Sequence, residues 1–141
     1  MEISEVRKRL RGAIDGAKRA AAARRTRMDE AAREYPRFLD AVGAPLFRQV
    51  AAVLKAQGYL FGVFTPTGSV RLMSEKNTDD FIELTLDVSG DAPLVIGRVR
   101  RARGSRILES ERPIGTGAIR ELTEEQVLDF LADEIGPFVE R

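Results

Sequence analysis

Residues 81–88 read FIELTLDV, and apolar and polar side chains alternate along this stretch from its second position. The apolar set is Ile82, Leu84, Leu86 and Val88, and the polar set between them is Glu83, Thr85 and Asp87. Successive side chains of a strand point to opposite faces of a sheet, so this period of two predicts a strand with one buried face. We expect the rest of the chain to be arranged around this strand.

Four more segments with strand-like composition surround it, separated by short turns and by the polar run 74–80. Proline and glycine in Thr65-Pro66-Thr67-Gly68 favour a type I turn, and Gly104 separates the last two segments. No helical pattern interrupts the series, which predicts a five-stranded antiparallel meander. The four additional strands are predicted at 59–65, 69–73, 93–103 and 105–112.

A helix is predicted after the strands. Residues 123–126 read TEEQ, a capping box in which Thr123 and Gln126 satisfy each other's free backbone amides. Gly136-Pro137 is expected to end this helix. The side chains expected to form its buried face, against the sheet, are Val127, Leu128, Leu131 and Ile135.

The N-terminal segment has the pattern of a long helix. Its apolar residues recur three and four positions apart, as in a coiled-coil seam. Because this stripe resembles the contact face of a coiled coil, we predict that it mediates oligomerisation. The predicted contact residues are Ile3, Val6, Leu10, Ala13 and Ala17.

Pro36 disfavours helical geometry at Tyr35 and is expected to kink or end this first helix. A short helical piece at 36–42 is then expected to break at Gly43. A second helix should begin near Pro45 and stop at Gly58, with an apolar face facing the core. That face comprises Leu46, Phe47, Val50, Val53 and Leu54.

Length suggests how these parts fit together. A continuous helix over residues 4–34 would be about 45 Å long, whereas the remaining compact chain would be only about 33 Å across. One end of the helix should therefore project, unless the helix bends at Gly12 or Gly16 and folds back. We predict an α+β protein with two parts: a projecting basic helix at 1–35, and a globular domain at 36–141 whose meander is covered by a C-terminal helix.

Composition removes several function classes. The chain has 141 residues with neither cysteine nor histidine, which excludes Ser-His-Asp and Cys-His catalysis and zinc sites built from these residues. The loop and strand start SEKNTDDFIE (74–83) gather four carboxylates, which could hold Mg²⁺ or Ca²⁺. Their spacing fits no known metal motif, so we expect a solvated loop, no metal and no cofactor.

Without a leader-like or membrane-spanning apolar run, a cytoplasmic location is expected.

Charge is unevenly distributed along the chain. Residues 1–27 hold nine Lys and Arg against three acids (+6), and residues 119–141 hold seven acids against two arginines (−5). The stretch RVRRARGSR (98–106) is the least ordinary. Its arginines could grip phosphates, or they could guard a sheet edge and pair with nearby acids. These candidate binding residues are Arg98, Arg100, Arg101, Arg103 and Arg106.

Together these patterns predict a non-catalytic interaction or adaptor protein that acts through its N-terminal helix and the arginine-rich hairpin. A homo-oligomer or a protein partner is expected, and a membrane is not, since residues 1–27 lack Trp and Phe. The alternatives are sequence-independent nucleic-acid binding and, third, an enzyme that uses clustered carboxylates and a metal.

Overall fold

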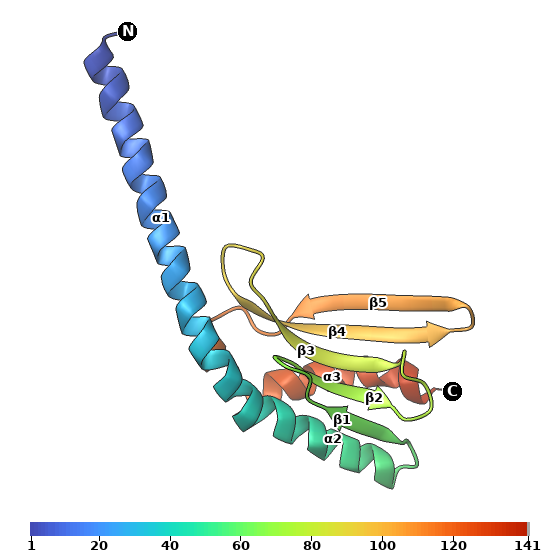
Figure 1. Ribbon diagram of the computed structural model, residues 1–141. Helices are drawn as coiled ribbons and strands as arrows, with labels where there is room; N and C mark the ends of the chain where they lie inside the picture. Colours follow the sequence, from blue (N-terminus) through green and yellow to red (C-terminus); the bar gives the residue numbers. More distant parts are fainter. Residues whose placement is uncertain (141) are drawn as a thin grey trace.

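The computed structural model describes residues 1–140 and shows an antiparallel sheet with helices on one face and a long helix leading away from it (Figure 1). This confirms the predicted α+β order of helices, meander and C-terminal helix. The helical elements are α1 (Ile3–Phe38), the π-helical turn η1 (Leu39–Gly43), α2 (Ala44–Ala56), the 3-10 turn η2 (Ile119–Glu121) and α3 (Glu124–Val139). The strands are β1 (Phe61–Phe64), β2 (Val70–Ser74), β3 (Phe81–Asp87), β4 (Leu94–Arg103) and β5 (Arg106–Pro113).

The five strands form one sheet in the order β1-β2-β3-β4-β5, with every neighbouring pair antiparallel. Ile82 of β3 lies opposite Leu72 of β2 and Val99 of β4, so the three form a row across the sheet. All three are buried, and for Ile82 the period-two pattern of residues 81–88 predicts this. Phe81 and Glu83 on the other face are buried too, so the expectation of one buried face is wrong for the first half of β3. Val88 lies just beyond β3 and is exposed, since the strand ends at Asp87.

Helices α2 and α3 cover the same face of the sheet and share its core. Phe47 of α2 and Phe130 of α3 are both buried in the main hydrophobic cluster with strand residues such as Leu84. Phe130 packs directly on Gly97 of β4, where a Cβ atom would come within 2.3 Å of the ring. Glycine at this position is therefore required for α3 to approach the sheet so closely.

Two helices continue through prolines: Pro36, which was expected to kink or end α1, and Pro137, which was expected to end α3. α1 runs through Pro36 to Phe38, and η1 then leads into α2 with Gly43 in helical geometry at φ −60°. α3 likewise runs through Pro137 to Val139. In both cases an aromatic residue beyond the expected stop is buried, Phe38 and Phe138, and this burial offsets the hydrogen bond that proline cannot make.

The turn between β1 and β2 also differs from the prediction. The Ser69 N–H donates to the Pro66 carbonyl at 3.0 Å, so the turn spans residues 66–69 rather than 65–68. Gly68 then occupies the third position with φ +79°, the conformation that a type II turn requires. The predicted type I turn is wrong because the hydrogen bond forms one residue later.

The N-terminal part of α1 stands away from the sheet as a straight helix (Figure 1). Every residue from Ile3 to Arg27 is exposed except the half-buried Gly16. This exposed segment is about 37 Å long at 1.5 Å per residue. The helix passes through Gly12 and Gly16 without folding back. At its base, Arg24 and Arg27 donate hydrogen bonds of 2.9–3.3 Å to the backbone carbonyls of Gly90 and Asp91 in the β3–β4 loop.

Candidate interaction surfaces

The projecting part of α1 carries an exposed apolar stripe. Ile3, Val6, Leu10 and Ile14 are 76%, 38%, 58% and 54% exposed, and their spacing puts them on one face of the helix. Ala13 and Ala17 are exposed as well, with Ala17 between Val6 and Leu10 on this face and Ala13 at its edge beside Val6. All five predicted oligomerisation residues thus lie on the part of α1 that the rest of the chain leaves uncovered.

Charged residues border one flank of this stripe. They are Arg7, Arg11, Lys18 and one acid, Asp15, and none of them forms an ion pair within residues 1–140. This flank is therefore mainly basic.

A second apolar surface lies between α2 and α3, on the side of these helices away from the sheet. It is a groove of about 320 Å³ in which glutamine is the only polar lining residue. Val53 is 62% and Leu128 46% exposed, although both were expected to face the core. The lining residues are Leu46, Gln49, Val50, Val53, Leu54, Leu128, Leu131, Ala132 and Ile135.

Sequence reasoning missed this groove. Both helices have apolar faces wider than the sheet covers, and the excess width was the only signal in the sequence. The packing angle between the two helices decides which residues of a wide apolar face remain exposed to solvent. The sequence does not give this angle, so the whole of each apolar face was predicted to lie in the core.

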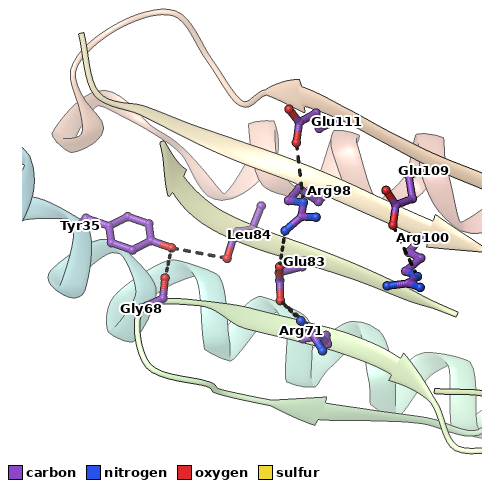
Figure 2. Close-up of polar contacts among 9 residues, drawn as sticks. All are labelled: Tyr35, Gly68, Arg71, Glu83, Leu84, Arg98, Arg100, Glu109 and Glu111. Carbon is purple, nitrogen blue, oxygen red and sulfur yellow. Dashed lines mark hydrogen bonds and ion pairs between the residues drawn. The ribbon is translucent and has the colours of Figure 1, made fainter. Parts of the chain in front are cut away.

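The sheet face opposite the helices carries a ladder of charges (Figure 2). Glu83 on β3 is only 3% exposed, and its Oε2 is 2.6 Å from Nη2 of Arg71 on β2. Its other oxygen is 3.6 Å from Nη1 of Arg98 on β4, and Arg98 Nε is 3.7 Å from Glu111 on β5. The ladder thus links four neighbouring strands, with both oxygens of the buried carboxylate facing guanidinium groups.

The same face is completed by arginine packing on apolar side chains. The Arg71 guanidinium lies 4.1 Å from the centre of the Phe81 ring, and Arg100 pairs with Asp79 and Glu109 at 3.7 and 3.5 Å. These long side chains cover Phe81, which is only 7% exposed without any helix on this face. The arginines here take the place of a second layer.

The five candidate arginines of the hairpin therefore divide into two groups. Arg98 and Arg100 belong to the charge ladder of the sheet. Arg101, Arg103 and Arg106 form no ion pair within residues 1–140, and Arg103 lies directly opposite Arg106 at the end of the hairpin. Of the five, these three present positive charge without an ion-pair partner.

The carboxylates of the loop after β2 do not converge on one point. Asp80 is 4% exposed and accepts the Ala102 N–H at 2.8 Å, while Asp79 and Glu83 pair with different arginines. Within residues 1–140 no group of three or more Asp or Glu side chains is arranged to hold a metal ion. The buried acids of this region instead connect strands.

Tyr35 ties the base of α1 to the sheet. Its hydroxyl lies 2.7 Å from the Gly68 carbonyl, to which it donates, and 3.4 Å from that of Leu84 (Figure 2). Burial, and secondarily the negative charge of Glu83, raises the pKa of this hydroxyl above its usual range. The neutral phenol is therefore the form that the fold holds.

Comparison of the chain with known protein families, with curated proteins and with solved structures gives no match. Among residues 1–140 there is also no helix long and apolar enough to cross a membrane. Function is thus argued from the surfaces above.

Proposed function

We propose that this protein is a non-catalytic interaction protein that associates with itself through α1. The observation that carries the proposal is the exposed stripe of Ile3, Val6, Leu10 and Ile14 on a helix that stands clear of its own domain. A contiguous apolar surface of this kind is a mark of an interaction site in proteins that act in water.

The energetics of the projecting helix support the same proposal. Burying a leucine, isoleucine or valine side chain contributes about 1.5–3 kcal/mol, and the four stripe residues obtain little of this from their own chain. On the open face of the sheet, by contrast, the buried Glu83 is paired with two arginines. The stripe thus differs from the sheet in having an apolar surface that its own chain leaves uncovered.

The test is the mass of the protein in solution. By light scattering at micromolar concentration we expect at least a dimer. A chain that lacks residues 1–27 should be a folded monomer, and the circular dichroism signal per remaining helical residue should equal that of the full-length protein. A full-length protein that stays monomeric at these concentrations would remove the proposal.

A second function is favoured by one observation. Arg101, Arg103 and Arg106 present positive charge without an acidic partner in residues 1–140, at a hairpin end where they could reach phosphates. Sequence-independent nucleic-acid binding through this hairpin is therefore the alternative. Figure 1 shows the hairpin end far from the free end of α1, so the two basic segments of one chain do not form a single patch.

A further inference from the structure

Within residues 1–140, the α1 stripe and the groove between α2 and α3 are both apolar and uncovered, and the groove is somewhat shorter than the stripe. The α1 stripe from Ile3 to Ile14 extends for about 17 Å at the helical rise. The groove between α2 and α3 is lined from Leu46 to Leu54 on one side and from Leu128 to Ile135 on the other, which corresponds to about 11–12 Å of each helix. A helix laid in this groove could bury most of the stripe.

We propose that the groove between α2 and α3 is the binding site for α1 of a second copy of this chain. This inference rests on the proposed self-association and adds the surface that receives the helix. It also sets aside the simpler arrangement, predicted from the heptad-like stripe, in which two α1 helices pair with each other.

The chain's own α1 cannot fill the groove. The path from Ile3 to Ala56 is helical throughout, so there is no flexible link about which α1 could fold back. Arg24 and Arg27 also hold its base to the β3–β4 loop, and Figure 1 shows the free end pointing away from α2 and α3. The occupant must therefore come from another molecule.

Charge identifies that molecule as a second copy. Residues 1–27 have a net charge of +6, nine bases less three acids, whereas residues 124–140 hold six acids and no base. At 3.6 residues per turn, Glu125 and Asp129 border the outer rim of the groove beside Leu128, and neither forms an ion pair within residues 1–140. These free acids match the free bases Arg7 and Arg11 beside the stripe.

The two rims of the groove differ in charge. The α2 rim has the uncharged Gln49 and, one turn on, Ala52, whereas the α3 rim has the free acids Glu125 and Asp129. The basic flank of α1 is therefore expected to lie over α3, which sets the way α1 lies in the groove.

Pairing of two α1 helices is disfavoured by the same charges. It would bring two segments of +6 together and would leave both grooves open. Each copy instead offers one helix and one groove, so two copies that exchange α1 cover both surfaces and form a closed dimer.

The experiment is a complementation between two variants measured by sedimentation or light scattering. Leu10→Glu puts an acid into the stripe, and Leu128→Arg puts a base into the groove. Each variant alone should lose self-association, with the dissociation constant rising roughly 10- to 100-fold from loss of one buried leucine. Mixed together they should associate again, because the helix of one copy and the groove of the other are intact.

Matched controls separate this result from general damage. Ala23→Glu makes the same charge change on the opposite, exposed face of α1, and Leu108→Arg alters a leucine that is 37% exposed on β5, away from the groove. Both should associate as the unchanged protein does. Since Leu10 and Leu128 are themselves 58% and 46% exposed, the test variants should keep the circular dichroism of the parent.

Two outcomes distinguish failure of this inference from failure of the proposed function. If the unchanged protein is monomeric, self-association itself is wrong. If it is a dimer and Leu128→Arg still dimerises, only the groove assignment is overturned, and α1 pairs elsewhere.

Salt provides an independent measurement on the unchanged protein. Attraction between basic α1 and acidic α3 is screened by added salt, so the dissociation constant should rise between low and high ionic strength. Pairing between two basic α1 helices would show the opposite sign, because salt would relieve their repulsion. Tighter association at high salt would overturn the groove assignment.

Discussion

At the scale of single residues, Gly97 has no Cβ atom, and this allows α3 to pack close to the sheet. We expect Gly97→Ala to lower the free energy of unfolding by about 1–3 kcal/mol, because the added methyl group would force the buried Phe130 ring to move. Chemical denaturation measures this loss. Gly90→Ala is the control, since a Cβ there meets nothing within 4 Å, and an equal loss at both positions would contradict the packing argument.

Tyr35 leads to a prediction that depends on pH. Its raised pKa means that the fold favours the neutral phenol, so its stabilising contribution is complete below about pH 10, the ordinary value for tyrosine. As pH rises above that value the unfolded chain ionises first, and the contribution is progressively lost. Tyr35→Phe should therefore cost about 0.5–1.5 kcal/mol at pH 7, and less at pH values above 10.

The measurement is the difference in unfolding free energy between the parent and Tyr35→Phe across pH 7–11. Tyr59→Phe removes the same hydroxyl at a position that is 37% exposed and is the matched control. A difference that stayed constant or grew toward alkaline pH would contradict the assigned hydrogen bonds of Tyr35.

At the scale of elements, α3 combines a local start signal with long-range packing. The capping box is present as predicted: Gln126 N–H donates to Thr123 Oγ1 at 3.2 Å, and Thr123 N–H donates to Gln126 Oε1 at 3.0 Å. Thr123→Ala should cost about 1 kcal/mol and Thr123→Ser almost nothing, whereas Leu131→Ala should cost about 2–5 kcal/mol because that side chain is 1% exposed. Equal, small losses in denaturation would mean that α3 does not dock on the sheet.

Local chemistry explains which elements the sequence could predict. The alternation of residues 81–88 and the capping box act over a few residues, so both could be read without tertiary structure. The continuation of the helices through Pro36 and Pro137 could not be predicted in this way, because it depends on the burial of Phe38 and Phe138 in the tertiary structure. The groove and the charge ladder were out of reach for the same reason: they are made by segments far apart in the chain, such as Arg71 and Glu83 with Arg98.

At the scale of the whole molecule, the distribution of charge gives a test of the nucleic-acid alternative. If the three unmatched hairpin arginines each neutralise one phosphate of duplex DNA, log affinity should fall with log salt at a slope of about −2.7. Replacing Arg101, Arg103 and Arg106 with serine should weaken binding to all sequences alike and flatten that slope. Fluorescence anisotropy with two unrelated duplexes measures both effects. Absence of binding by the parent at low salt would exclude this alternative.

The projecting arm of α1 has a mechanical consequence. It is about 37 Å long and is held only at its base, so a small force at its free end produces its greatest torque where the arm meets the domain. That place is the contact of Arg24 and Arg27 with the Gly90 and Asp91 carbonyls. Load on the distant tip is thus transmitted to the β3–β4 loop, which acts as the fulcrum of a lever.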